Sequence, residues 1–476
     1  MAEEIRPSAS ETRSSSLPRV LGLWDIIAII VGGVIGSGIF IVPKDIAAAV
    51  GSPLLMMAVW VVGGLLSFFG ALTFAEMGAA YPQAGGMYVF LREAYGKLPS
   101  FLFGWTLFLV IDTGALATLA VAFSSKYLPF FIPSLGDPAG GLTATVFGLK
   151  LLVTPSQAVA VALILFLAAV NILGTRWGAN LQNLLTVVKF VALAGICVVV
   201  FLFAEGSTRN FLSPPSKPLS LDLISAFGLG LVAVMWAYKG WEQATFSAGE
   251  TKHPERNIPL GLFAGTLVVI GIYIAANLAY LYVFPAPEIA ASDRIASLVM
   301  NKAVGGLGAA IIAAIILFSI TGAANQNLLC SPRVYYAMAK DGIFIPALSR
   351  VHGRFKTPHL SILSMSAWSV VLILFFGTFE RLFTYVVFGQ WLFFGLTAAA
   401  VFILRAKKPG LPRPYRTFGY PLIPAVFILS ALFISLNSLV RRPQDALLGL
   451  GIIFLGLPVY FVFLFLRTKP RAEAQT

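Results

Sequence analysis

The sequence predicts an all-α integral membrane protein with twelve transmembrane helices. Of its 476 residues, 58% are hydrophobic and only 11% are charged, and the mean hydropathy is +0.88. Soluble domains carry about a quarter of their residues as charged side chains. The apolar residues lie in runs of about 20 or more, each long enough to cross about 30 Å of hydrocarbon as a helix. The expected spans are 21–47, 53–80, 99–123, 156–174, 178–204, 222–249, 259–284, 306–338, 359–378, 382–404, 420–440 and 446–467.

The distribution of basic residues predicts the orientation of the chain. The net charge is +13, but Lys and Arg lie in short loops between apolar runs, which argues against nucleic acid as a partner. With the spans above, about two thirds of these residues fall in one set of alternating loops. An excess of basic residues marks the cytoplasmic side of a membrane. We therefore expect a multi-pass protein of the cell (inner) membrane with both termini in the cytoplasm.

The cysteines and the N-terminus carry no sign of secretion or of covalent pairing. Both cysteines, Cys197 and Cys330, lie inside expected spans, so no disulfide framework is expected. The loop 124–155 has no cysteine, and we expect no covalently attached heavy chain. Residues 1–18 are rich in serine and charge without an apolar core, which is typical of a disordered cytosolic tail rather than a signal peptide.

Sequence patterns for other chemistry are missing. The chain has no GxxxxGK[ST] motif, so ATP hydrolysis is not indicated. The three histidines, His253, His352 and His359, lack the spacing of metal ligands, and we expect neither a metal nor a cofactor. No group of acids, histidines or nucleophiles converges in the sequence as an enzyme would require, so we do not expect an enzyme.

Two of the expected spans contain segments that disfavour a continuous helix. Residues 32–38 read GGVIGSG, and four glycines in seven residues weaken a helix by about 4 kcal/mol relative to alanine. Residues 236–242 read WAYKGWE and place two charges near mid-membrane. Interrupted helices at matching positions of two halves indicate an inverted-repeat transporter with its site at the bilayer midplane. A single glycine-rich span is otherwise explained by close helix packing.

This pattern predicts the domain organisation of the chain. The two interruptions lie about 200 residues apart, and each falls in the first helix of a five-helix group. The expected units are a cytosolic tail at 1–18, a first repeat at 19–204, a second, inverted repeat at 222–404, helices 11 and 12 at 420–467, and a cytosolic tail at 468–476.

The interruptions also predict what the site would bind. Non-helical backbone inside a membrane is tolerated only where it lines a cavity or is buried in protein. The N–H groups of residues 37–39 would open a downstream half-helix, whose positive end suits a carboxylate. The carbonyls of residues 33–35 and 236–237 would end upstream half-helices and suit an ammonium group. Together these groups fit a zwitterion such as an α-amino acid.

Four sequence segments resemble the amino acid–polyamine–organocation superfamily, most closely its L-type amino-acid transporter branch. They are GGVIGSGIFIVP (32–43), AEMGAAYPQAGGMYVFLREAYG (75–96), WAYKGWEQATFSAGETKHPERNIP (236–259) and SPRVYYAMAKDG (331–342). The resemblance runs over nearly the whole chain. It implies a leucine-transporter-like fold with 5+5 inverted repeats and discontinuous helices 1 and 6. It also implies sodium-independent exchange or facilitated transport of L-amino acids by alternating access.

The resemblance also implies the roles of individual residues. Ser37 and Gly38 match positions that bind the substrate carboxylate, and the carbonyls of Val34 and Trp236 match positions that take the amino group. The expected gate residues are Trp236, Tyr238 and Trp241, with ordinary packing as the alternative role for the two tryptophans. The expected substrate-binding set is Val34, Ile35, Gly36, Ser37, Gly38, Trp236, Ala237, Lys239 and Gly240.

Lys189 is the most informative charged residue inside a span. A lysine within hydrocarbon is costly and indicates function by default. It resembles a lysine of sodium-independent members of the superfamily, whose ammonium group takes the place of a sodium ion. A fixed positive charge here would tie the first and eighth spans together. Proton coupling and a purely structural hydrogen bond are the alternatives.

Lys239 departs from the pattern of the superfamily and bears on the choice of substrate. A cation beside the pocket repels basic side chains and favours neutral or acidic ones. Asp112 or Glu242 would neutralise it, and Glu242 matches an acidic position that relatives exchanging arginine and agmatine use in their pH response. Neutral amino acids are the leading expectation. Acidic substrates, and a proton-coupled or antiport carrier of cationic amino acids or polyamines, are the alternatives.

The ends of several spans carry further polar residues. Glu76 and Glu250 are expected to close an inner gate through Arg92, Lys252, Arg256 or Arg333, or else to lie on a solvated face. Ser319 and residues 325–327 are expected to bond Lys189 or to link helices. A non-transporting, amino-acid-sensing membrane receptor is the competing function, although the short tails leave no visible signalling domain.

Overall fold

The computed structural model describes residues 17–136, 141–146, 149–212, 221–376, 379–441 and 443–468. The expected tails at 1–18 and 468–476 lie almost wholly outside these residues. Ten described helices are long and apolar enough to cross a membrane, and the count is eleven if the bent pair Leu23–Val34 and Gly38–Val50 forms one span. His359–Phe375 is a shorter apolar helix.

Helices account for almost all of the described secondary structure. The α-helices are α2 (Leu23–Val34), α3 (Gly38–Val50), α4 (Pro53–Ala80), α5 (Met87–Tyr95), α6 (Lys97–Thr106), α7 (Asp112–Val121), α8 (Pro155–Ile172), α9 (Thr175–Phe203), α10 (Leu221–Ala237), α11 (Pro254–Val283), α12 (Ala286–Ala291), α13 (Ile295–Val304), α14 (Leu307–Cys330), α15 (Pro332–Lys340), α16 (His359–Phe376), α17 (Phe379–Lys407), α18 (Leu422–Arg441) and α19 (Pro443–Thr468). The π-helical segments are η1 (Leu107–Ile111) and η2 (Ala122–Tyr127). The 3₁₀ segments are η3 (Leu128–Phe130), η4 (Pro133–Gly136), η6 (Thr208–Phe211), η7 (Trp241–Glu250) and η8 (Pro346–Ser349).

Both predicted helix breaks are confirmed. The first span bends by 45° between α2 and α3, at residues 35–37. The sixth span leaves the α-helix after Ala237, turns, and continues as the 3₁₀ segment η7. Gly240 in this turn has φ +121°, a left-handed backbone conformation that glycine adopts without the steric cost of a Cβ atom.

Three other elements differ in detail from the expected spans. The third span contains two π-helical stretches, η1 and η2, on either side of α7. The segment between η4 and α8 includes an antiparallel hairpin of β1 (Leu142–Val146) and β2 (Leu149–Val153), which pairs Leu142 with Val153. Between the second and third spans the chain forms α5, whose residues 87–91 are buried, so it packs inside the protein.

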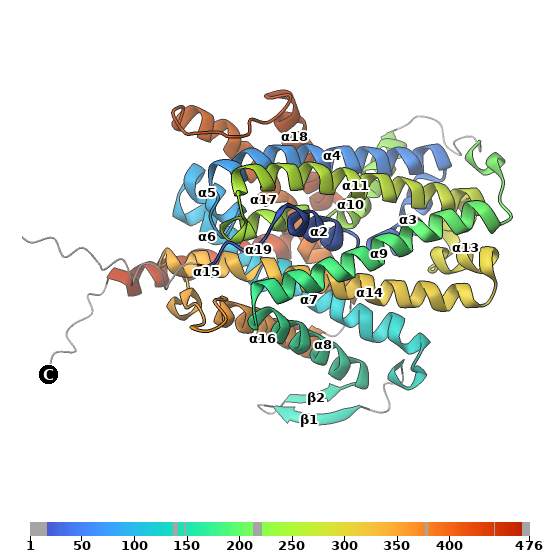
Figure 1. Cartoon of the computed structure of the whole chain (residues 1–476), viewed down its shortest axis with the longest axis horizontal. Coiled ribbons are helices and arrows are strands. Elements are labelled where there is room, and N and C mark those ends of the chain that lie inside the picture. Colours follow the sequence, from blue (N-terminus) through green and yellow to red (C-terminus); the bar gives the residue numbers. More distant parts are fainter. Residues whose placement is uncertain are drawn as a thin grey trace, which may run out of the picture.

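The helices form a bundle around the first broken span. In Figure 1 the long helices run roughly side by side, α2 lies in the middle, and the β1–β2 hairpin lies beside α8 at the edge. Helix α2 contacts α9, α11 and α14. Large apolar side chains such as Leu202, Leu436 and Phe465 are exposed on the outer helices. Such a surface fits a lipid environment, and the break in α2–α3 is buried in protein.

Candidate substrate site

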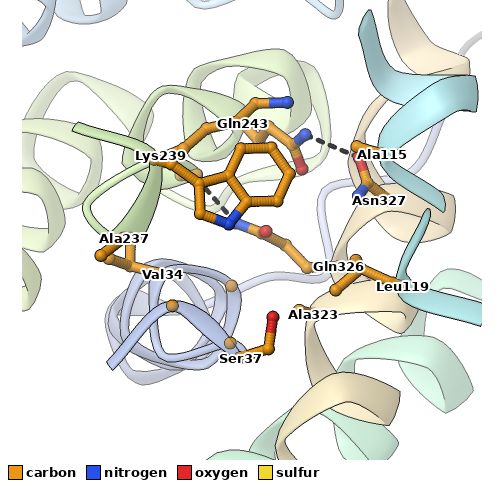
Figure 2. Close-up of a pocket in the computed structure, with 15 residues that line it drawn as sticks. Val34, Ser37, Ala115, Leu119, Ala237, Lys239, Gln243, Ala323, Gln326 and Asn327 are labelled. Carbon is orange, nitrogen blue, oxygen red and sulfur yellow. Dashed lines mark hydrogen bonds between the residues drawn. The ribbon is translucent and has the colours of Figure 1, made fainter. Parts of the chain in front are cut away.

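A cavity of about 50 Å³ lies where the two helix breaks meet. Its walls come from the α2–α3 break, the end of α10 and the start of η7, with α7 and α14 opposite (Figure 2). The lining residues are Gly33, Val34, Gly36, Ser37, Gly38, Ala115, Leu119, Trp236, Ala237, Lys239, Gly240, Gln243, Ala323, Gln326 and Asn327. Eight of the nine predicted substrate-binding residues are among them, and Ile35 is not.

Glycines allow the two breaks to touch each other. A Cβ atom added to Gly38 would lie 2.7 Å from the Cα atom of Ala237, and a Cβ atom on Gly33 would lie 1.8 Å from Oε1 of Gln326. No real side chain approaches neighbouring backbone this closely. The glycines at the first break therefore do two things. They weaken the helix, and they allow α10 and α14 to pack closely against it.

The start of α3 offers hydrogen-bond donors to the cavity. Helix α3 begins at Gly38, and the first N–H groups of a helix have no partner inside the helix. The hydroxyl of Ser37 is buried and has no hydrogen-bond partner in the part of the chain that the structure describes. The positive end of the α3 dipole adds to these donors. This corner of the cavity suits a carboxylate.

Tyr273 contacts the carbonyl oxygens on the other side of the breaks. Its hydroxyl lies 2.7 Å from the oxygen of Val34 and 3.0 Å from the oxygen of Ala237. A hydroxyl carries one proton, so it donates one full hydrogen bond or shares it between the two acceptors. The oxygen of Val34 also accepts from the N–H of Gly36, at 2.8 Å, so both of its lone pairs are in use, whereas the oxygen of Ala237 keeps a lone pair for an ammonium group. Tyr273 was not predictable from the sequence, because a tyrosine in the apolar run of α11 resembles a packing residue.

The amide side chains of α14 and η7 supply the polar wall of the cavity. Gln326 donates to the carbonyls of Ile29, at 3.0 Å, and Gly240, at 2.7 Å, and so links both broken spans. Gln243 donates to Asn327 at 2.8 Å (Figure 2). The sequence indicated that residues 325–327 link helices, but it did not single out Gln243 or the small residues Ala115 and Ala323.

Lys189 lies behind the first break, outside the cavity lining. Its side chain is 1% exposed, and its ammonium group donates to the carbonyls of Gly32, Ile35 and Ser319, the last two at 2.8 and 3.2 Å. The Ser319 hydroxyl also donates to Ile35, at 2.8 Å. The carbonyl of Ile35 thus faces Lys189 and Ser319 rather than the cavity. The predicted tie between the first and eighth spans is present.

The two charged residues of the second break, Lys239 and Glu242, have different partners. Nζ of Lys239 lies 3.3 Å from Oδ1 of Asp112 and 6.0 Å from the ring centre of Trp236. Asp112 also accepts from the Ser331 hydroxyl, at 2.5 Å. Glu242 is not among the lining residues, and its carboxylate accepts from the N–H of Gly240, at 3.0 Å, and from the side-chain amide of Gln390, at 2.7 Å.

Only one of the three predicted gate aromatics reaches the cavity. Trp236 lines it, whereas Tyr238 packs edge-on against Trp60 and close to Tyr273. Trp241 packs against a group of three phenylalanines, Phe74, Phe394 and Phe427. Tyr238 and Trp241 therefore pack against other aromatic side chains and do not line the cavity.

The two acidic residues expected at an inner gate are both paired. Glu250 and Arg333 are fully buried, and Nε of Arg333 lies 2.5 Å from Oε2 of Glu250. Arg333 also donates to the hydroxyl of Thr175. Glu76 pairs with Arg405 through two contacts of 2.9 and 2.7 Å, instead of with Arg92. The expected partner Arg333 is therefore correct for Glu250. The partner of Glu76 lies at the end of α17, and nothing in the sequence indicated that this end lies near α4.

The fold and the site together define a class of protein. The described residues contain no group of three or more His, Cys, Asp or Glu side chains that would hold a metal ion. The site is a small polar cavity between two broken helices in a bundle of long apolar helices. This arrangement is typical of a secondary membrane transporter.

Comparison with known proteins identifies the family. Residues 21–464 match the family model described as amino acid permease. The serine/threonine exchanger SteT of Bacillus subtilis (strain 168) is 31% identical over 453 residues, which cover 94% of this chain and 98% of the relative. The human b(0,+)-type amino acid transporter 1 is 33% identical, covering 97% of this chain and 91% of the relative, and the human cystine/glutamate transporter is 32% identical, covering 96% and 87%. The chain belongs to the amino acid permease family and is a multi-pass membrane transporter, not an enzyme.

Proposed function

We propose that this protein is a sodium-independent exchanger or facilitator of L-amino acids that works by alternating access. The observation that carries the proposal is the cavity at the two breaks. It brings the N-terminus of α3 and the Ser37 hydroxyl together with the end of α10, where the carbonyl of Ala237 is the proposed acceptor for the ammonium group. Donors and acceptors placed this way match the carboxylate and the ammonium group of one zwitterion. SteT and the human relatives above bear names of amino-acid transporters or exchangers.

Sodium independence is supported by Lys189. Its ammonium group bonds three carbonyls of α2, the break and α14, where a bound cation would otherwise join these segments. We assign Lys189, Glu242 and Asp112 to coupling between substrate binding and the movement of helices.

Neutral amino acids are the proposed substrates. The cavity is small, and its polar side chains are amides, the hydroxyl of Ser37 and the ammonium group of Lys239. Lys239 disfavours cationic side chains, and its pairing with Asp112 reduces its attraction for acidic ones. The alternative, a proton-coupled or antiport carrier of cationic amino acids or polyamines, is supported by Glu242. It is buried beside this pair, and its side-chain contacts are to the N–H of Gly240 and to Gln390.

The proposed topology has twelve spans. It counts α2–α3 as one span and adds α16 to the ten long helices. We place an inverted pair of repeats at 19–204 and 222–404, helices 11 and 12 at 420–467, and both termini in the cytoplasm of a cell that bears the protein in its plasma or inner membrane. Both cysteines are buried, which supports function without a disulfide-linked heavy chain.

Transport by the purified protein in proteoliposomes tests the proposal. Uptake of a labelled neutral amino acid is measured with and without internal amino acid, with and without sodium, and with and without a pH gradient, in competition with all common amino acids. We expect inhibition by neutral L-amino acids and no sodium requirement. The Lys239→Gly variant should admit cationic competitors. Absence of flux for every amino acid in all conditions would refute the proposal.

A further inference from the structure

A second cavity, of about 350 Å³, lies between the first turn of α3, the end of the third span, and helices α13 and α14. We call it the outer cavity, because the proposed topology places it on the extracellular side. Its floor includes the buried apolar residues Phe40, Ile312 and Ile316, and its rim includes the exposed residues Lys126 and Arg294. The complete lining is Phe40, Ser125, Lys126, Tyr127, Pro129, Phe130, Asp293, Arg294, Ala296, Ser297, Ala309, Ile312, Ala313 and Ile316.

The outer cavity and the central cavity share three supporting elements. On α3, Phe40 lies two residues beyond Gly38. On the third span, Lys126 lies seven residues beyond Leu119, and on α14, Ile316 lies seven residues before Ala323. Seven residues correspond to about 10 Å along a helix. The outer cavity therefore lies outward of the central cavity along the same three elements, and the buried side chain of Phe40 lies between the two cavities.

The rim of the outer cavity is rich in positive charge. Lys126 and Arg294 both line it and both act electrostatically on the acidic residue there, Asp293, which also forms an ion pair of 2.5 Å with Lys44 of α3. The cations around Asp293 thus outnumber its single carboxylate. The hydrogen bond from Lys44 lowers the pKa of Asp293, so this carboxylate stays ionised and paired at neutral pH. A ligand that fits cations at the rim and an apolar floor has a carboxylate and a hydrophobic part.

We propose that the outer cavity is a loading site for amino acids on their way to the central site. The carboxylate of the ligand faces Lys126 and Arg294, and its side chain lies against Phe40 and Ile316. This inference rests on the proposed function and on the proposed orientation. It adds a second binding step, which operates only for substrate that arrives from the outer face.

Sided kinetics in oriented proteoliposomes test the proposal. The variants are Lys126→Gln and Arg294→Gln, and the matched control is Lys302→Gln. Lys302 lies on α13, the helix that begins just after Arg294. It faces the ring of Phe284 and does not line the cavity. We expect each rim variant to raise the outer KM about three- to fivefold, the effect of one exposed charge pair, and to leave the inner KM unchanged. The control should leave both values unchanged, which separates the cavity from general attraction by surface charge.

Two results of this experiment would overturn the loading site. One is an outer KM that does not change in either rim variant. The other is an equal rise of KM on both faces, because that would place the effect in the central site or in the overall fold.

A labelling experiment tests the same site without depending on transport. Both native cysteines are buried, so Ser297→Cys introduces one accessible thiol into the outer cavity. We expect saturating L-leucine or L-serine to slow its reaction with a charged methanethiosulfonate reagent at least threefold. The concentration for half-protection should rise in the Arg294→Gln background. Protection without any transport would refute the proposed function and keep the site, whereas transport without protection would refute the site and keep the function.

Discussion

Lys189 shows how one side chain joins three segments of a membrane protein. Its ammonium group bonds carbonyls from α2, from the break that follows α2, and from α14. The carbonyls of Gly32 and Ile35 lie where the first span is broken, whereas the carbonyl of Ser319 lies within the regular helix α14. In the proposed function the lysine takes the place of a bound cation, but it is attached to α9 and cannot dissociate. The connection between these segments is therefore independent of ion concentration.

Replacing Lys189 with alanine should abolish transport or slow it at least tenfold. Loss of the ammonium group leaves the carbonyl of Gly32 without its buried side-chain donor and removes one of the two donors to Ile35, and one such loss costs about 1–3 kcal/mol. Initial uptake rates are compared at equal amounts of protein in the membrane. Val188→Ala is the control, because this neighbouring side chain is exposed on the same helix. Wild-type rates in the alanine variant would remove Lys189 from the transport cycle.

Tyr273→Phe should raise the KM for amino acids about five- to tenfold with a smaller change in maximal rate. The hydroxyl contacts both Val34 and Ala237, and a net hydrogen bond is worth about 0.5–1.5 kcal/mol. The control is Tyr280→Phe on the same helix, because the buried hydroxyl of Tyr280 has no hydrogen-bond partner among the described residues. A competing α-hydroxy acid, which lacks the ammonium group, should lose less affinity than the amino acid. An equal loss for both ligands would contradict a role in orienting the carbonyls.

At the scale of elements, residues 20–21, just before α2, are joined to η7 and the residue after it by backbone contacts, and η7 is joined to α15 by an ion pair. Leu21 pairs with Thr251 as a parallel β-bridge, and the N–H groups of Val20 and Leu21 donate to the carbonyl of Glu250. The same residue, Glu250, pairs through its side chain with Arg333 of α15. Backbone and side chain of one residue thus connect the chain before α2 with η7 and α15.

Arg333→Met should lower the stability of the purified protein strongly. Removing one partner of a buried ion pair leaves an uncompensated charge and costs about 3–5 kcal/mol. The double variant Glu250→Gln, Arg333→Met should recover part of this loss, because no buried charge remains. Lys44→Met is the control, since its partner Asp293 is 82% exposed and surface pairs contribute at most about 1 kcal/mol. Thermal unfolding in detergent measures all four proteins, and equal shifts for Arg333→Met and Lys44→Met would contradict the prediction.

For the whole molecule, local sequence signals predicted the parts of the fold that depend on short-range physics. Runs of apolar residues predicted the long helices, and the glycines of 32–38 together with the charges of 236–242 predicted both breaks. Lys189 was recognisable because a charge inside an apolar run is costly anywhere in it. These features can be read from one segment at a time.

Features that depend on contacts between distant segments were not predictable in the same way. Tyr273 and Gln243 lie in runs that look like ordinary packing or polar surface, and only the approach of α11 and α14 to the breaks gives them their partners. Glu76 meets Arg405, 329 residues away, which no spacing rule indicates. The outer cavity also depends on how α13 lies over α3 and α14.

The close contact between Gly38 and Ala237 limits where substrate preference can change. No side chain fits at Gly38, so the half of the cavity that we propose to bind the common part of every amino acid tolerates almost no variation. The opposite wall, made by Ala115, Leu119 and Ala323, has no such restriction. Divergence or engineering of this protein is therefore channelled to that wall, and enlarging or reshaping it alters which amino acid is carried without disturbing how amino acids as a class are held.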